Sequence, residues 1–131
     1  MAGMKQILLM IAVVALVGCG PTISDPILEK EIRAELKKPI GELTKADLEK
    51  VTRLELERNQ LTDVKGLENL TQLKSLYLRD NRLTDVKGLE KLTQLKELHL
   101  GDNQLTSVKG LENLTQLETL NLAGNKLTSV K

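Results

Sequence analysis

Cysteine, histidine and aromatic residues are nearly missing from this 131-residue sequence, which has no Phe or Trp and one each of Cys19, Tyr77 and His99. A single cysteine excludes an intramolecular disulfide, so the folded domain depends on packing. The hydrophobic fraction is nevertheless 40%, and because aromatic bulk is absent the core must be aliphatic. The length allows one domain.

Residues suited to catalysis are equally scarce. The sequence has no glycine-rich phosphate loop, no serine beside a histidine base and no paired carboxylates in a predicted pocket. His99 has Glu97 and Asp102 close in sequence, but one imidazole with two loosely placed carboxylates makes at most a weak divalent-cation site. We therefore expect neither catalysis nor a bound metal or cofactor.

Charge of one sign is not in excess. Of the 19 basic residues only Lys5 lies within residues 1–18, which contain no acid, so 18 basic residues balance 18 acidic ones in the rest of the chain. Binding to nucleic acid needs clustered Lys and Arg that neutralise phosphates, and attraction to anionic membranes needs a basic segment. We expect no nucleic-acid partner.

Residues 1–18 differ in composition from the remainder. Lys5 precedes an unbroken apolar run of 11 residues, 7–17. A helix that crosses a bilayer of about 30 Å needs about 20 residues, so this run favours an export signal over a permanent transmembrane helix.

The sequence Leu-Val-Gly-Cys at residues 16–19 resembles the lipobox of bacterial lipoproteins. The resemblance implies that residues 1–18 are cleaved off, that Cys19 carries lipid and that residues 19–24 form a short tether to a membrane of the cell envelope. In a cell with two membranes, Gly20 after the cysteine implies the outer membrane. The alternative is a chance cysteine behind an ordinary signal peptide.

Residues 25–50 are expected to form a helical N-terminal cap. Asp25 followed by Pro26 is typical of a helix N-cap with proline at the first helical position. Apolar side chains then recur every four residues on one face: Leu28, Ile32 and Leu36. We interpret this helix as the lid of the domain, with a partner-binding amphipathic helix as the alternative.

The remainder of the chain is a 22-residue repeat. The pattern Leu-x-Leu-x-x-Asn-x-Leu begins at Leu54 and returns at Leu76, Leu98 and Leu120. A unit this short cannot bury its own apolar face, so the copies must stack into a solenoid. Alternating leucines predict one short strand per unit. The three-residue spacing of the leucines after each Lys-Gly predicts a turn or a single helical coil. The charged side chains of each Lys-Gly-Leu-Glu block are expected to lie on a solvated face.

This pattern resembles the leucine-rich repeat, specifically the 22-residue class of bacterial internalins, over residues 51–131. Three units are complete and the fourth is partial. The resemblance implies an α/β solenoid with short parallel strands on the concave face and turns or 3-10 coils on the convex face. It also implies recognition of a protein or peptide on the concave face.

Four asparagines share one position of the repeat: Asn59, Asn81, Asn103 and Asn125. Their period places them inside the coil, where an amide can bond backbone groups that would otherwise be unpaired. We expect them to stabilise the fold and not to bind a partner.

The outward positions of the strands vary while the framework does not. They form three columns across the strands: Arg53, Ser75, Glu97 and Thr119; Glu55, Tyr77, His99 and Asn121; Glu57, Arg79, Gly101 and Ala123. Tyr and Arg dominate the energetics of interfaces. We predict a partner-binding concave site made of Arg53, Glu55, Glu57, Tyr77, Arg79, Glu97, His99 and Asn121. The alternative is that Tyr77 is an ordinary exposed tyrosine in a variable column.

The leading interpretation is therefore a membrane-anchored leucine-rich repeat protein that binds a protein or peptide partner in the cell envelope. Two alternatives stay open. The fourth unit, which stops short of its convex leucines, could stack end to end on another copy or another protein, or the chain could be a truncated remnant of a longer repeat array.

Overall fold

The computed structural model describes residues 23–128, so the expected signal peptide and Cys19 lie outside the described part. Two helices precede the repeats, α2 (Pro26–Leu36) and α3 (Lys45–Leu48). The strands are β1 (Arg53–Glu55), β2 (Ser75–Tyr77), β3 (Glu97–His99) and β4 (Thr119–Asn121), and the 3-10 turns between them are η1 (Leu67–Asn69), η2 (Leu89–Lys91) and η3 (Leu111–Asn113). Between residues 23 and 128, no helix is long and apolar enough to cross a membrane.

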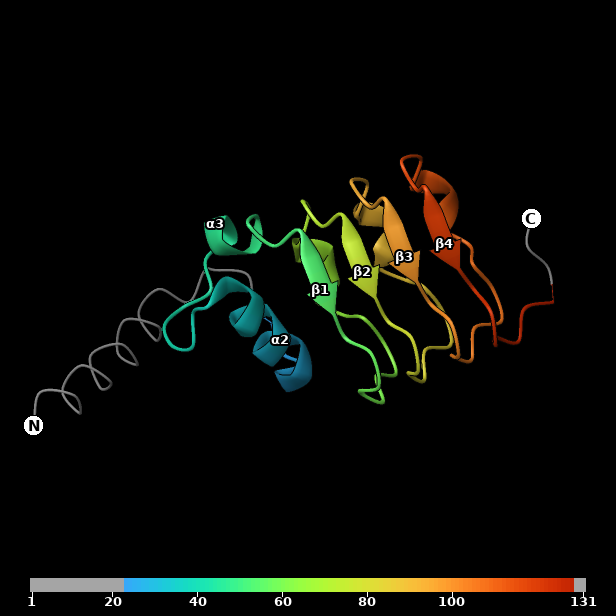
Figure 1. The fold of residues 1–131 in the computed structure, drawn as a ribbon, viewed down its shortest axis with the longest axis horizontal. Coiled ribbons are helices and arrows are strands. Elements are labelled where there is room, and N and C mark those ends of the chain that lie inside the picture. Colours follow the sequence, from blue (N-terminus) through green and yellow to red (C-terminus); the bar gives the residue numbers. More distant parts are fainter. Residues whose placement is uncertain (1–22, 129–131) are drawn as a thin grey trace, which may run out of the picture.

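The four strands form one parallel sheet in the order β1-β2-β3-β4, and the 3-10 turns lie on the opposite side of the coil (Figure 1). Each strand pairs with the next one repeat later, so Leu54 lies beside Leu76 and Leu76 beside Leu98. The predicted solenoid with strands on one face and 3-10 coils on the other is confirmed.

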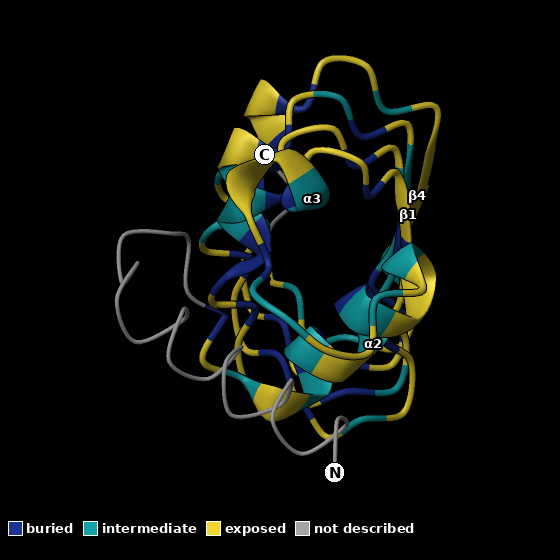
Figure 2. Cartoon of the chain, turned by 90° about the vertical axis from the view of Figure 1, so that its left-hand side faces the viewer, coloured by how far each residue is buried: buried dark blue, intermediate teal, exposed yellow. Residues whose placement is uncertain are grey.

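The interior is filled mainly by leucines. The coils surround it, with buried positions on successive coils (Figure 2). Leu76 and Leu98 are 0% exposed, and the cap residues Leu28, Ile32 and Leu48 belong to the same buried cluster. The helical cap and the repeats therefore share one core.

Helix α2 begins as expected, because the Oδ1 of Asp25 accepts a hydrogen bond of 2.8 Å from the backbone N–H of Ile27. It ends where Lys37 adopts a left-handed conformation, with φ of 55°. Glu29 and Arg33 form an ion pair of 2.9 Å across one turn. The short helix α3 was not anticipated. Its signal is a capping box in which Thr44 and Asp47 exchange side-chain and backbone hydrogen bonds of 2.9 and 3.1 Å.

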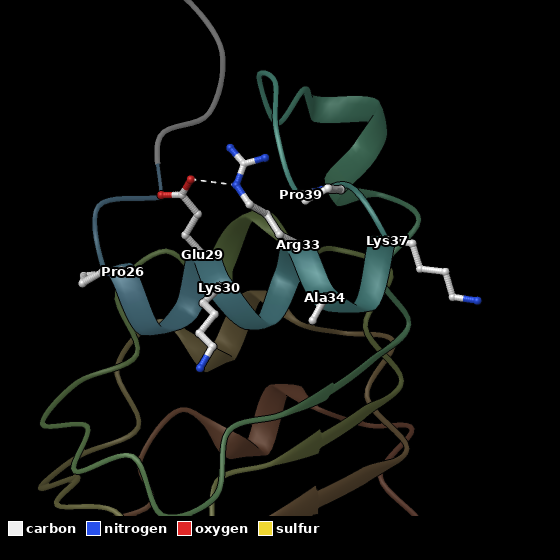
Figure 3. A pocket seen from close by; sticks show the side chains of 7 residues that line it. All are labelled: Pro26, Glu29, Lys30, Arg33, Ala34, Lys37 and Pro39. Atoms are coloured by element: carbon white, nitrogen blue, oxygen red, sulfur yellow. Dashed lines mark hydrogen bonds and ion pairs between the residues drawn. The ribbon is translucent and has the colours of Figure 1, made fainter. Parts of the chain in front are cut away.

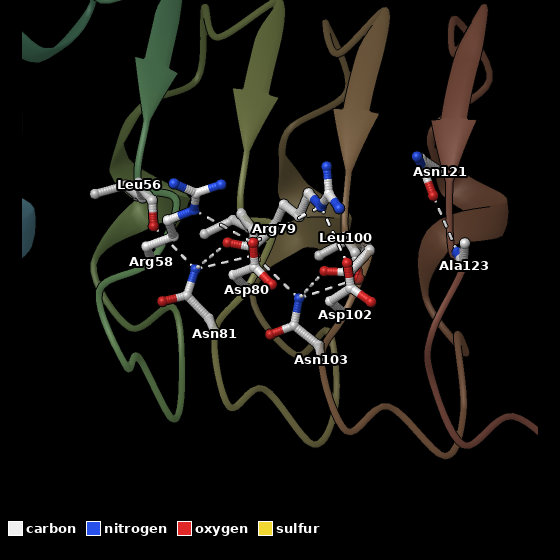
Figure 4. Close-up of polar contacts among 12 residues, drawn as sticks. Leu56, Arg58, Arg79, Asp80, Asn81, Leu100, Asp102, Asn103, Asn121 and Ala123 are labelled. Carbon is white, nitrogen blue, oxygen red and sulfur yellow. Dashed lines mark hydrogen bonds and ion pairs between the residues drawn. The ribbon is translucent and has the colours of Figure 1, made fainter.

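Three of the four repeated asparagines, Asn81, Asn103 and Asn125, donate to backbone carbonyls of the coil. Figure 4 shows Asn81 and Asn103. In Asn81 the Oδ1 accepts from the N–H of Leu61 at 3.0 Å, and Asn103 makes the equivalent bond to Leu83 at 3.1 Å. The prediction is wrong for Asn59, which is half-buried and whose side chain forms no hydrogen bond within residues 23–128. No earlier repeat lies beneath Asn59 to supply the backbone carbonyl that its amide would meet.

In the convex turns, a glycine N–H donates a hydrogen bond to the carboxylate of the glutamate two residues later. Gly88 has φ of 101°, a conformation that favours glycine, and its N–H donates a hydrogen bond of 2.7 Å to the carboxylate of Glu90. The same bond joins Gly110 to Glu112 at 2.7 Å. The charged block was assigned to a solvated face, but its glutamates also stabilise the turns.

Candidate functional site

Tyr77 lies at the centre of the concave sheet, on β2. The guanidinium carbon of Arg53, from β1, is 4.6 Å from the centroid of the Tyr77 ring. The Nη1 of Arg53 also donates a hydrogen bond of 3.1 Å to the Tyr77 hydroxyl. Arg53 in addition pairs with Glu55 on its own strand, so the guanidinium is held from two sides.

The ring of His99, from β3, stacks on Tyr77 with centroids 4.9 Å apart and planes 13° from parallel. This spacing equals the distance of about 4.8 Å between neighbouring strands, and Tyr77 and His99 are direct partners in the sheet. Because β2 lies between β1 and β3, Arg53 and His99 approach Tyr77 from opposite sides. We call these three residues the concave stack.

Glu97 forms a hydrogen bond with His99, the third residue of the concave stack. Its Oε1 lies 2.9 Å from the Nε2 of His99, and this hydrogen bond lowers the pKa of the Glu97 carboxyl below its ordinary value. The sequence led us to expect loosely placed carboxylates around His99. That expectation is wrong for Glu97, which contacts the imidazole directly.

A row of ion pairs lies beside the concave stack, just after the ends of the strands (Figure 4). The Nε of Arg79 lies 3.0 Å from Asp102 and 3.7 Å from Asp80, and Arg58 reaches Asp80 at 3.5 Å. Asp102 is therefore paired with Arg79 and not with His99. Among residues 23–128, no group of three His, Cys, Asp or Glu side chains could hold a metal ion.

The backbone keeps the predicted columns in place. Arg53, Ser75, Glu97 and Thr119 align in one, and Glu55, Tyr77, His99 and Asn121 in the next. Beyond the strands, the N–H of Arg58 donates to the carbonyl of Arg79 at 3.0 Å and that of Asp80 donates to Gly101 at 3.1 Å, which keeps the third column together.

Two predicted site residues stand apart from these contacts. Glu57 is exposed and forms no hydrogen bond or ion pair with the described part of the chain. Asn121 is bonded within its own repeat, because its Oδ1 accepts a hydrogen bond of 3.0 Å from the backbone N–H of Ala123. Arg58 and Asp80 were not predicted at the site, and Asp102 was considered only as a neighbour of His99. Their common signal is a charged residue at the position after the third column in three successive repeats.

A separate shallow surface cavity of about 720 Å³, wide open to solvent, lies on the outer side of α2 (Figure 3). Its lining consists of Pro26, Glu29, Lys30, Arg33, Ala34, Lys37 and Pro39. Arg33 is occupied there by structural bonds, at 2.9 Å to Glu29 and 2.8 Å to the carbonyl of Gly41. None of the predicted site residues lines this cavity.

Comparison with known proteins places the repeats in a family. A family model described as leucine-rich repeats (2 copies) matches residues 49–91 and 93–131. No curated protein matches the chain significantly.

Solved structures of internalins from Listeria monocytogenes are similar to this chain. Internalin InlF is 34% identical with a TM-score of 0.75, over 80% of this chain and 32% of its own. Internalin C2 is 30% identical with a TM-score of 0.80, over 86% of this chain and 53% of its own. The functional domain of InlJ is 30% identical with a TM-score of 0.71, over 82% of this chain and 24% of its own. The chain thus matches from about a quarter to about half of the length of these structures. Since the family model covers more than half of the sequence and the coils repeat in register, the chain belongs to the leucine-rich repeat family.

Proposed function

We propose that this protein binds a protein or peptide partner through its concave face, in the cell envelope, where lipid on Cys19 attaches it to a membrane. The observation that carries the proposal is the concave stack, in which Arg53, Tyr77 and His99 come from three different repeats and contact one another. These positions differ from repeat to repeat, whereas the framework leucines and asparagines do not. The strongest variation between repeats lies on this one ordered surface, which fits recognition better than folding.

The order of the concave stack favours binding. Tyr77 is held between a guanidinium and an imidazole, so little side-chain freedom remains to be lost when a partner docks. Because both ring faces are covered, a partner would meet the ring edge and the hydroxyl. Four strands span only about 15 Å, which suits a peptide, a loop or the edge of a small protein.

The proposal is tested with Tyr77→Ala in the full chain, expressed in its own cell and crosslinked before extraction. We expect partner capture to fall at least tenfold, since a buried tyrosine anchor contributes about 2 kcal/mol or more. Lys91→Ala, on the exposed convex turn η2, serves as the matched control. Unchanged capture by Tyr77→Ala, with an unchanged circular dichroism spectrum, would remove Tyr77 from the site.

A second candidate function is end-to-end association, favoured by the exposure of the last strand. Leu120 is 42% exposed, whereas Leu76 and Leu98 at the same repeat position are 0% exposed. An open strand edge with an apolar residue beside it is a surface for pairing with another chain. Under this reading the full chain associates as its concentration rises and Leu120→Glu abolishes the association. A monomer at all concentrations would reject it.

A further inference from the structure

The outer side of α2 exposes apolar residues along a shallow surface (Figure 3). Pro26, Ala34 and Pro39 line the open cavity described above, and all three are exposed. Ile40, the residue after Pro39, is 61% exposed. We call Ile40 and the residues that line the cavity the cap surface. Because a ligand pocket buries most of its ligand, a surface this shallow suits a flat, extended partner better than a small molecule.

The cap surface carries an excess of positive charge. Glu29 and Arg33 neutralise each other in their ion pair of 2.9 Å. Lys30 and Lys37 are exposed, and neither forms an ion pair with another residue of the described part of the chain. Two further acids of α2 lie about 100° and 140° round the helix from Lys30, away from the cap surface: Glu31 and Glu35. The two lysines are therefore available to an anionic partner.

The cap surface begins close to the proposed lipid. Helix α2 starts at Pro26, seven residues after Cys19. An extended chain spans at most about 3.6 Å per residue, so lipid on Cys19 would hold the start of α2 within about 25 Å of the membrane. At such a distance a second contact is intramolecular, with an effective concentration in the millimolar range. A surface too weak to bind a membrane alone can then remain in contact with it.

We propose, on the basis of the lipid attachment at Cys19 proposed above, that the cap surface docks on the anionic phospholipid headgroups of the membrane. Lys30 and Lys37 pair with lipid phosphates, and each lysine near an anionic surface favours the contact about fivefold. Ile40 enters the apolar edge of the headgroup layer. None of the predicted concave-site residues lines the cavity, so the docked protein keeps its concave face for a partner.

The test uses the full lipidated chain in vesicles made either of phosphatidylcholine alone or of equal parts phosphatidylcholine and phosphatidylglycerol. Both contain a spin-labelled lipid that quenches fluorescence on contact. Ala34→Cys carries a fluorophore on the cap surface, and Asn113→Cys carries it on the exposed turn η3 as the control. Because lipid occupies Cys19, the new thiol alone takes the label. We expect quenching at position 34 to be at least fivefold stronger in the anionic vesicles, and position 113 to be quenched little in either.

Two matched pairs of charge reversals locate the contact. Lys30→Glu combined with Lys37→Glu is expected to lower quenching at position 34 at least tenfold in the anionic vesicles. Lys65→Glu combined with Lys87→Glu makes the same change of charge at exposed positions of the repeats and should leave quenching within about twofold.

Equal quenching at position 34 in the neutral vesicles, or indifference to the reversals in α2, would overturn docking by the cap surface. Lipid attachment would still stand in that case, because the chain remains bound to the vesicles. A chain that does not bind the vesicles, and whose Cys19 also takes the fluorophore, would overturn lipid attachment and docking together.

Discussion

The Nδ2 of Asn81 donates a hydrogen bond of 2.9 Å to the carbonyl oxygen of Leu56, in the preceding repeat. The same nitrogen donates to the carbonyl of Leu78 in its own repeat, also at 2.9 Å. One buried amide thus joins two coils of the solenoid. Each repeat is too short to be stable alone, so bonds between repeats determine whether the domain folds.

Asn81→Ala is therefore expected to destabilise the protein. Removing the amide leaves buried backbone groups unpaired, which costs about 1 to 3 kcal/mol in the free energy of unfolding. Asn59→Ala removes the same group from a half-buried position without such bonds and should cost less than about 0.5 kcal/mol. Urea unfolding followed by circular dichroism measures both values, and equal losses would contradict the structural role.

The leucines of the strands provide a second matched pair. Leu98→Ala opens a cavity at a position with 0% exposure and should cost about 2 to 5 kcal/mol. Leu120→Ala, at the same repeat position on a strand where the leucine is 42% exposed, should cost less than half of that. If thermal unfolding showed the two variants to be equally destabilised, Leu120 would be buried in solution, and end-to-end contact would explain it.

Asp47 gives the cap a dependence on pH. Hydrogen bonds from Lys38, at 2.7 Å, and from the N–H of Thr44 lower the pKa of the Asp47 carboxyl from 3.8 to about 2. Because the folded state favours the charged form, this stabilisation is complete above about pH 4 and is lost as the pH falls to about 2.

We expect Asp47→Asn to lower the free energy of unfolding by about 1 to 2 kcal/mol at pH 7, allowing for partial exposure of the pair. The difference from the parent protein should shrink between pH 4 and pH 2. Glu49→Gln, at an exposed position just after α3, is the control and should change little. A difference that stays constant down to pH 2 would rule out the charge of Asp47 as its cause.

Membrane attachment is predicted to depend on one atom, the sulfur of Cys19. In Cys19→Ser no lipid can be attached at this position, and the apolar contribution of about 0.8 kcal/mol per buried methylene is lost. The variant should leave the membrane fraction on cell fractionation, whereas Ser24→Ala should remain there. Retention of unprocessed Cys19→Ser in the membrane would instead favour a permanent apolar anchor formed by residues 7–17.

The sequence predicted the strands, the convex coils and the columns because a strict 22-residue period fixes which residues become neighbours. Tyr77 and His99 must be adjacent in any such solenoid, since they are 22 residues apart. The prediction for Asn59 was wrong because the period describes a repeat inside the stack, and Asn59 lies in the first repeat.

The contacts between side chains could not be predicted from the period. Whether Asp102 approaches His99 or Arg79 depends on rotamers, and it pairs with Arg79 at 3.0 Å. Helix α3 was missed because four residues are too few for a hydrophobic period, although the Thr44 to Asp47 spacing carries the capping signal.

Photo-crosslinking in intact cells tests the central claim, that the concave face is the binding surface. A photoreactive amino acid is placed at positions 77, 79 and 99 in turn, and at position 122 as the control for an end contact. We expect the three concave positions to capture the same protein and position 122 to capture none of it. Capture from position 122 alone would contradict binding by the concave face.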